Sequence, residues 1–390
     1  MTPRTTAALG LALAALALVP AAADGKYWVI RGHGFGHGVG MSSYGSYGFA
    51  RHGRTYGQMM HHYYRGTHLG HVKGRHVKVL LAAGSGAVTF SKANAACGRH
   101  LRPRSAYRFA ATGSGVALQN AAGRTLTGCG PSGTASGGPI HVHGQGTYRG
   151  RLIAHGGGSI ELVNKVGLEG YTKGVVPSEV FPSWPQPALR AEAVAARTFG
   201  LAAVHHGRFD VYDDTRSQVY GGKGKETPTT NRAVKASKGK IVKYHQQIAT
   251  TMYSSSSGGY TESIQNAFIG ASPVHYLKGV KDPYDGASPL HTWKLPDLSE
   301  GGVASKLSGL FSGALRGIKV LRRGVSPRIV YARVVGSRGS SRVTGSELAS
   351  RLGTYSSWIH FRQRRGKAPV SASSTEPPAP AALPPGSGGP

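Results

Sequence analysis

The sequence predicts an α+β fold rich in β-structure, and two patterns lead to this prediction. Short runs of β-branched and aromatic residues, separated by Gly, Ser and Asn, fill residues 76–142, as in strands joined by turns. By contrast, residues 187–206 place Leu189, Ala193 and Ala196 on one face at helical spacing, which indicates a long amphipathic helix. A chain of 390 residues can hold one large domain or two smaller ones.

Residues 1–23 have the pattern of a secretory signal peptide. Arg4 supplies a positive charge, residues 7–18 form an apolar run, and three alanines at 21–23 offer small side chains for cleavage. The apolar run is too short to span a bilayer well, so an uncleaved anchor is the weaker reading. We expect a secreted, extracellular protein that begins near Asp24.

Residues 24–75 form a segment in which a short strand and a glycine-rich turn precede two expected helices, at 42–51 and 56–64. His33 and His37 lie four residues apart in the glycine-rich turn. A zinc site with that spacing needs a helix, which the surrounding glycines disfavour. We therefore expect no metal here and interpret these histidines as structural or substrate-facing.

Residues 76–145 are expected to form a small β-rich subdomain. Cys97 and Cys129 both lie in it, and in an oxidising compartment a disulfide between them is the default. Closing a loop of that length stabilises the fold by roughly 3–4 kcal/mol in the chain-entropy model. The following residues, 151–166, have the pattern of a β-hairpin.

Residues 146–365 form the larger expected domain. Besides the helix described above, the pattern predicts strands at 211–220, 248–253 and 328–335 and helices at 303–315 and 345–352. Residues 366–390 are rich in Pro, Ala, Ser and Gly and lack the apolar content for a core. We expect them to be a disordered tail.

Basic residues greatly outnumber acidic ones. The chain has 47 Lys and Arg against 16 Asp and Glu, a net charge of +31, and such a field attracts polyanions. Outside the cell these are anionic wall polymers, anionic lipids or nucleic acid. Neither a recognition helix nor an aromatic RNA-binding pattern is present, so we expect no nucleic-acid partner. We also expect no cofactor.

Because carboxyl groups are scarce, few residues are candidates for acid–base chemistry, and Glu179 is the foremost. It is expected on a Pro- and Trp-rich turn just ahead of the 187–206 helix. There it could simply favour the helix N-terminus. The functional alternative is that Phe181 and Trp184 desolvate the carboxyl and raise its pKa, which keeps it protonated as a general acid.

The sequence leaves the role of two further groups of polar residues undecided. Four aspartates in expected turns could supply the second carboxylate of a glycosidase, although capping of their own backbone is favoured; they are Asp213, Asp214, Asp282 and Asp285. The stretch SSSSGGYTE at 254–262 fits either a sugar-lining loop or a plain loop. A serine nucleophile lacks support because no GxSxG elbow accompanies it.

The order and spacing of several segments resemble the SpoIID/LytB family, the stage II sporulation protein D group. These segments are VNKVGLEGYTKGVVPSEVFPSWPQPALRAEAVAARTF (163–199), FDVYDDTRSQVYGG (209–222), NRAVKASKGKIV (231–242), YSSSSGGYTES (253–263), YLKGVKDPYD (276–285) and TGSELASRLGTYSS (344–357). Residues 31–67, RGHGFGHGVGMSSYGSYGFARHGRTYGQMMHHYYRGT, look like the family's GHGVGMSQYGA segment with its downstream hYYxGT motif, and Ser43 and Ser46 stand in place of the usual Gln and Ala. Here this segment follows the signal peptide, which implies that it folds back onto the catalytic domain.

The resemblance implies a β-rich catalytic domain with a supporting helix, and the activity of a peptidoglycan lytic transglycosylase. Such an enzyme cleaves the MurNAc–GlcNAc bond and leaves 1,6-anhydro-MurNAc ends. Glu179 matches the catalytic glutamate of the family's VPSE segment, and one group that donates and then accepts a proton suffices for this reaction. The shared segments further imply a glycan groove with these residues: Arg197, Gln218, Tyr220, Ser254, Ser256, Gly258, Gly259 and His37.

Two other readings stay open. The LytB branch implies a non-catalytic wall-binding module that enhances a cell-wall amidase, its partner. The third reading is a polyanion-binding structural protein, held on wall polymers by basic segments such as RQRRGK at 362–367. Binding of that kind weakens as salt is added.

Overall fold

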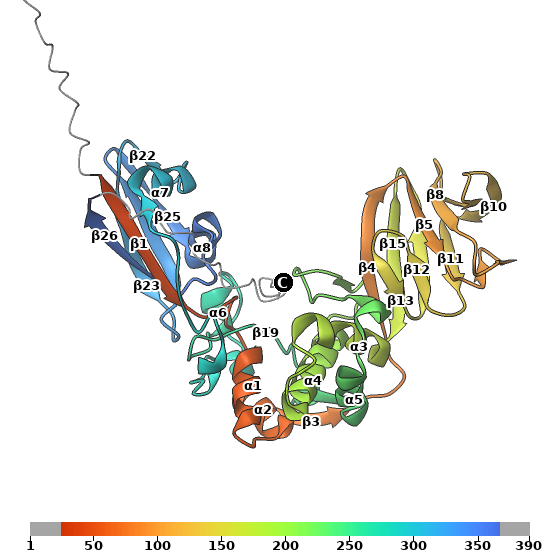
Figure 1. The fold of residues 1–390 in the computed structure, drawn as a ribbon, viewed down its shortest axis with the longest axis horizontal. Coiled ribbons are helices and arrows are strands. Elements are labelled where there is room, and N and C mark those ends of the chain that lie inside the picture. The colour runs from red at the N-terminus through yellow and green to blue at the C-terminus, as the bar shows by residue number, and fades with distance from the viewer. Residues whose placement is uncertain (1–24, 367–390) are drawn as a thin grey trace, which may run out of the picture.

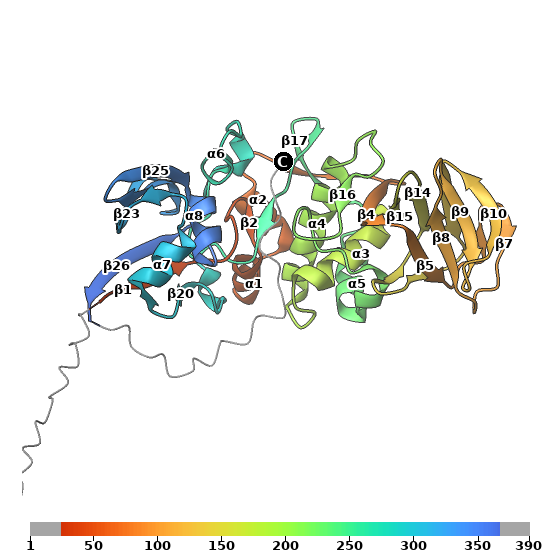
Figure 2. The ribbon, with the colours of Figure 1, turned by 90° about the horizontal axis from the view of Figure 1, so that it is seen from above.

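The computed structural model describes residues 25–366. The expected signal peptide and the expected tail from Lys367 lie outside these residues. Helices and many strands in several sheets confirm the α+β, β-rich fold class. Figures 1 and 2 show an elongated molecule with a β-rich lobe at each end and helices between them. None of the described helices is both long and apolar enough to cross a bilayer.

The first lobe consists of residues 76–167, to which the short strand β16 (Val211–Tyr212) is added. Its six-stranded sheet has the order β10 (Thr125–Gly130), β9 (Val116–Asn120), β8 (Tyr107–Ala111), β5 (Ala87–Ser91), β12 (Ile140–Val142), β13 (Gly146–Tyr148). Its seven-stranded sheet has the order β16 (Val211–Tyr212), β4 (His76–Ser85), β15 (Ile160–Gly167), β14 (Arg151–His155), β11 (Ser132–Ser136), β6 (Ala95–Ala96), β7 (Arg99–His100). The expected hairpin is confirmed, because β14 pairs antiparallel with β15. The expected disulfide between Cys97 and Cys129 is present.

The second lobe joins the first described strand to the last part of the chain. In one sheet β1 (Lys26–His33) pairs with β20 (Thr292–Lys294), β21 (Leu298–Ser299) and β26 (Ile359–Arg365). The other sheet has the order β22 (Phe311–Ser312), β25 (Gly339–Thr344), β24 (Ile329–Gly336), β23 (Leu315–Arg323). Helices α7 (Glu300–Lys306) and α8 (Gly345–Leu352) accompany them. This lobe has its own hydrophobic core.

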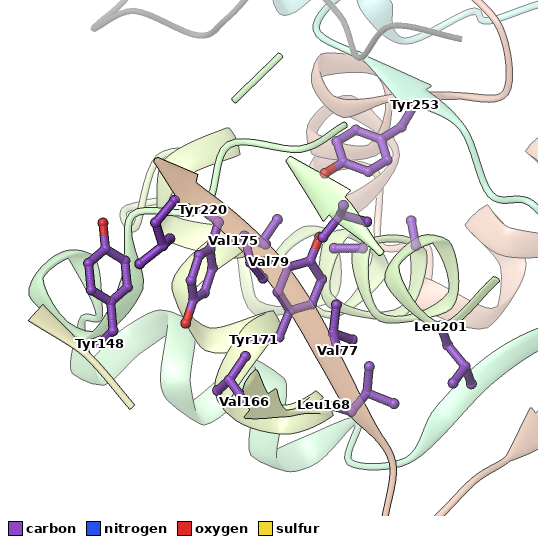
Figure 3. Packing of buried hydrophobic residues seen from close by; sticks show 14 of the residues in the cluster. Val77, Val79, Tyr148, Val166, Leu168, Tyr171, Val175, Leu201, Tyr220 and Tyr253 are labelled. Carbon is purple, nitrogen blue, oxygen red and sulfur yellow. The ribbon is translucent and has the colours of Figure 1, made fainter. Parts of the chain in front are cut away.

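The central helices connect the two lobes. They are α3 (Leu168–Glu179), α4 (Gln186–Ala202), α5 (Pro228–Ala236) and the short α6 (Ile264–Ala267). Beside them lies a sheet with the order β18 (Gln247–Ile248), β17 (Lys240–Tyr244), β3 (His68–His71). Figure 3 shows the core that they share with the first lobe, in which Val77 and Val79 of β4 meet Tyr171 and Val175 of α3.

The glycine-rich N-terminal segment crosses from the second lobe to the central helices. It continues as β2 (Met41–Ser42), α1 (Ser43–Arg51) and α2 (Tyr56–Tyr63), which confirms both expected helices. Ser42 is the N-cap of α1, and its hydroxyl accepts a hydrogen bond from the backbone N–H of Gly45. β2 pairs in parallel with β19 (Tyr253–Ser254). This pairing fixes α1 beside the segment rich in serine and glycine.

The helix expected at 187–206 is confirmed, but it ends at Ala202 and not at Gly207. The chain turns back earlier, because the carboxylate of Asp210 accepts backbone N–H bonds from His205 and Lys78. Pro187 lies in its first turn, as expected.

Three predicted elements are only partly correct. The strand at 211–220 stops at Tyr212, because the chain then turns and the N–H groups of Ser217 and Tyr220 bond to nearby carbonyls. The strand at 248–253 survives only at its two ends. The helix at 303–315 stops at Lys306 and is followed by β22 and β23. How the chain divides into domains stays a prediction.

Candidate active site

Glu179 is the last residue of α3, not a turn residue ahead of α4 as the sequence predicts. The segment contains Gly170, Gly174 and Pro177, which all disfavour a helix interior. Packing overrides this preference, since α3 buries Tyr171, Val175 and Val176 in the core. The carboxyl therefore lies at the negative end of a helix dipole, an environment that favours its protonated form.

One backbone donor holds the Glu179 side chain in place. The N–H of Val219 donates to Oε1 of Glu179 at 2.7 Å. Val219 belongs to the turn that replaces the predicted strand, and this turn is fixed by bonds from Tyr220 N–H to Asp213 and from Gly221 N–H to Gly174 of α3. Among residues 25–366, this N–H is the hydrogen-bond donor found for the Glu179 carboxyl.

Glu192 is a second buried glutamate at this site, and the sequence reasoning missed it. It lies on α4 and is fully buried, while its Oε2 accepts a bond from the Ser43 hydroxyl of α1 at 3.2 Å. Its Oε1 has no hydrogen-bond partner among residues 25–366. The sequence does carry a signal, because Ala188, Glu192 and Ala196 share one buried helix face at four-residue spacing.

The two glutamates titrate in different ways. Burial raises the pKa of Glu179 to about 7, and the Val219 N–H partly opposes this shift. Burial, with the nearby Glu179 charge as a smaller cause, raises the pKa of Glu192 to about 8. At neutral pH Glu192 therefore carries its proton, while Glu179 can both donate and accept one. That state suits a group that acts first as acid and then as base.

Further buried hydroxyls surround the pair. The Tyr253 hydroxyl donates to Oε1 of Gln218 at 2.8 Å, and both glutamates raise the pKa of Tyr253 in addition to its burial. The hydroxyls of Tyr171 and Ser254 are buried without a hydrogen-bond partner among the described residues. Unpaired buried polar groups are rare in folded proteins, so these two hydroxyls set the surroundings of the pair apart from an ordinary core.

Aromatic side chains from two segments meet next to Glu179. Trp184, in the turn between α3 and α4, lies 5.1 Å from Tyr44 and 5.0 Å from Tyr47 of α1 between ring centroids. Phe181 lies 6.0 Å from the same indole. Tyr47 and Phe181 remain half-exposed, so the two segments together present aromatic surface to a ligand.

Three of the expected groove residues are engaged in the protein interior. Arg197 is fully buried; it pairs with Glu169 and uses its remaining N–H groups on three backbone carbonyls. No donor is left for a sugar, so we assign Arg197 a structural role. Gln218 bonds to Tyr253 and to the carbonyl of Ala196. The buried Tyr220 donates to Asn164.

The segment from Ser254 to Gly259 lies against the glycine-rich N-terminal segment. The hydroxyl of Ser256 and the N–H of Gly258 bond to Asp285, and Gly259 donates to the Ser257 hydroxyl. Gly258 and Gly259 both have positive φ, 73° and 104°, which explains the glycines. Ser254 pairs with Ser42, the neighbour of the Ser43 whose hydroxyl bonds to Glu192.

Asp282 and Asp285 do not simply cap their own turn, the interpretation favoured from the sequence. Both are buried and accept bonds from distant residues, including Tyr63 and Ser42. Their hydrogen bonds join the aspartates to α2, to the N-cap of α1 and to the 254–259 segment. Asp213 is different: it is half-buried near Glu179's turn, and burial together with Asp214 raises its pKa to about 6.

The expected histidine, His37, is half-buried and accepts a bond from the N–H of Val39. Burial, helped by the Arg328 charge, lowers the pKa of His37 to about 3, so the ring is neutral. Among residues 25–366, no group of three or more His, Cys, Asp or Glu is arranged to hold a metal ion.

The comparison with protein-family models points to the same region of the chain. Residues 156–244, which include both glutamates, match the family described as SpoIID, stage II sporulation protein. An amidase enhancer of Bacillus subtilis is 43% identical over 101 residues, which cover 26% of this chain and 14% of that protein. Stage II sporulation protein D of the same organism is 37% identical over 131 residues, which cover 29% and 38% of the two chains.

A third relative, an uncharacterized protein of Brachyspira hyodysenteriae, is 40% identical over 116 residues, covering 29% of this chain and 32% of that protein. In each case the match spans less than two fifths of the relative's length. The matched family region holds α3, α4 and the turn that binds Glu179. Residues 156–244 therefore form a region that belongs to the SpoIID family.

Proposed function

We propose that this protein is a secreted, cell-wall-associated lytic transglycosylase that cleaves peptidoglycan glycan strands, with Glu179 as its acid and base. The observation that carries the proposal is a half-buried carboxyl, fixed by a single N–H bond, whose pKa is raised to about 7. The family membership supports a role at the cell wall. The finer assignment of activity is our own.

The proposed reaction balances with one titrating group. Glu179 donates its proton to the glycosidic oxygen as the bond from that oxygen to C1 of MurNAc breaks. The C6 hydroxyl of the same MurNAc then closes on C1, and its proton passes to the Glu179 carboxylate, which restores the acid. The products are a 1,6-anhydro-MurNAc end and a free GlcNAc hydroxyl, and no water is consumed.

Glu192 fits this scheme as a neutral neighbour. Its pKa of about 8 keeps it protonated at neutral pH, so it adds no second charge beside the carboxylate that forms on Glu179. The half-exposed rings of Tyr47 and Phe181 can stack against sugar rings. Binding of the glycan strand at this site is also our proposal.

The second candidate function is enhancement of an amidase, which the name of one Bacillus subtilis relative favours. In that case the chain binds glycan or a partner hydrolase and cleaves nothing. The two functions separate clearly, because only the enzyme needs the proton of Glu179.

Mass spectrometry of purified glycan strands, with and without stem peptides, tests the proposal. The protein is compared with its Glu179→Gln variant, which keeps the side-chain shape but cannot donate the proton. We expect new 1,6-anhydro-MurNAc ends from the wild type alone, with a rate loss of about 10²–10⁴ in the variant. Hydrolytic reducing ends would indicate a glycosidase with a second carboxylate such as Asp213. Stimulation of an amidase without cleavage by the protein itself would indicate the enhancer.

A further inference from the structure

A row of basic side chains crosses the outer face of the sheet made of β23, β24 and β25. Lys319 on β23 lies directly opposite Arg333 on β24, and Arg333 lies directly opposite Arg342 on β25. Side chains of directly opposite residues project from the same face, with their Cβ atoms about 4.5–5.5 Å apart. All three are exposed.

The other face of these strands is apolar and buried. Ala332, Val334 and Val343 alternate with the basic residues and lie in the core of the second lobe. The alternation therefore directs every cation of the row outward.

No acidic group compensates this row within the described part of the chain. Among residues 25–366, neither Lys319, Arg333 nor Arg342 forms an ion pair or a side-chain hydrogen bond. Like charges directly opposite one another on neighbouring strands destabilise a sheet. A sheet that keeps three of them in register, unpaired, has a cost that an anionic ligand would remove.

The aromatic ring of Tyr331 lies beside two arginines of this face. The guanidinium carbon of Arg342 lies 3.6 Å from the ring centre of Tyr331, and that of Arg322 lies 5.5 Å from it. Stacking on an aromatic face restricts a guanidinium while leaving its N–H edge free. Arg322 lies opposite Tyr331 on β23, so it extends the row to four cations.

We propose that this face, defined by Lys319, Arg322, Arg333 and Arg342, binds a linear phosphodiester polymer of the wall type. Arginine forks match the oxygens of a phosphate group, and a row of cations across three strands matches a chain with one charge per repeat. The Tyr331 ring is already covered by Arg342, which disfavours base stacking by nucleic acid. Ala332, Val334 and Val343 point inward, and Leu321 is the one large apolar residue of these strands that is exposed; a single such side chain offers little apolar area for insertion into a membrane.

The proposed surface is separate from the glutamate site. Figures 1 and 2 show β23 and β25 at one end of the elongated molecule, while α3 and α4 lie in its middle. The face also differs from the segment 362–367 singled out from the sequence, which lies in or beyond β26 of the other sheet. The surface would hold the protein on the wall independently of cleavage, so the proposal does not rest on the proposed activity.

Calorimetric titration of the whole protein with synthetic poly(glycerol phosphate), over a series of NaCl concentrations, tests this inference. The triple variant Lys319→Gln, Arg333→Gln, Arg342→Gln removes the row. The control variant Arg102→Gln, Arg104→Gln, Arg124→Gln removes the same charge from exposed arginines of the other lobe. Phosphatidylglycerol vesicles and duplex DNA serve as comparison ligands.

We expect the row variant to weaken polymer binding about tenfold or more and to reduce the slope of log Kd against log [NaCl] by about 2, at about 0.7 per lost contact. The control should change Kd less than about twofold. Thermal melting should show the row variant at least as stable as the wild type, because a repulsion is removed. Each of the following would overturn the proposal: equal losses in both variants, no loss in the row variant, a lower melting temperature for it, or tighter row-dependent binding of vesicles or DNA.

Discussion

Two pairs of acidic residues in this molecule have very different surroundings: Asp282 and Asp285 are both buried, whereas Glu192 is buried and Glu179 is half-buried. Asp285 accepts five hydrogen bonds, from Ser42, Ser256, Ser257, Gly258 and His291. In the other pair, Glu179 accepts one bond and Glu192 accepts one. Burial alone disfavours the charged form of a carboxyl, and donors restore it. The difference teaches that a raised pKa alone does not mark a site of proton transfer. Burial and the neighbouring Asp285 raise the pKa of Asp282 to about 7 as well, but Asp282 is buried and bonded to Tyr63 and Ser257, whereas Glu179 is half-buried and has one donor.

Asp285→Ala should have the largest effect on stability. It leaves several buried donors without an acceptor, and the imidazole of His291 without its partner. We expect the free energy of unfolding to fall by about 3–5 kcal/mol, measured by denaturant titration. The matched control is Asp214→Ala, whose exposed carboxylate pairs with Arg216 and should cost less than about 1 kcal/mol. Equal effects of the two variants would remove the contrast between the two kinds of site.

Glu192→Gln should stabilise the protein, and it should do so in a pH-dependent way. Its folded pKa of about 8 lies above the ordinary glutamate value of 4.5, so between these pH values the folded state binds a proton that the unfolded state lacks. Stability from this group is complete below about pH 4.5 and declines as pH rises towards 8. The neutral glutamine removes the decline and should stabilise the protein at pH 7 by roughly 3 kcal/mol.

Denaturant titrations at several pH values measure this effect. Glu347→Gln is the control, since Glu347 is an exposed surface residue paired with Arg351, and its replacement should leave the pH dependence unchanged. A Glu192→Gln protein with the same pH slope as the wild type would show that Glu192 is ionised in the folded state.

Ser43→Ala should have the smallest effect. The serine hydroxyl supplies the single hydrogen bond of Glu192 and joins α1 to α4. Its loss should cost about 1 kcal/mol and raise the pKa of Glu192 further, because this bond opposes the effect of burial. The matched control is Ser46→Ala, in which the lost hydroxyl bonds only within α1. A fall in the pKa of Glu192 would contradict the assigned role of Ser43.

Much of the fold follows from local sequence patterns. Residues of α4 keep an apolar face at helical spacing, and the hairpin of β14 and β15 alternates as strands do, so both were predictable. The helix α3 was not, because Gly170, Gly174 and Pro177 oppose it locally and only tertiary packing overrides them. Because local preferences hid α3, the sequence predicted Glu179 on a turn, whereas it is the last residue of that helix.

The candidate site was predictable only in part. Glu179 stands out because of its VPSE segment, but its donor comes from Val219, forty residues away and on a segment whose pattern resembles a strand. Glu192 looks like an ordinary charged helix residue until α1 covers it. The burial of Asp285 depends on contacts with Ser42, more than two hundred residues away, which no local pattern contains.

The most direct test of the central claim is a carboxyl-carbon NMR titration that assigns Glu179, recorded in the Glu192→Gln protein so that one buried glutamate remains at the site. Burial, and not Glu192, raises the pKa of Glu179, so the account predicts a titration midpoint near 7 in this variant. A midpoint near the ordinary value of 4.5 would contradict it, because Glu179 would then be ionised at neutral pH and could not serve as the proton donor.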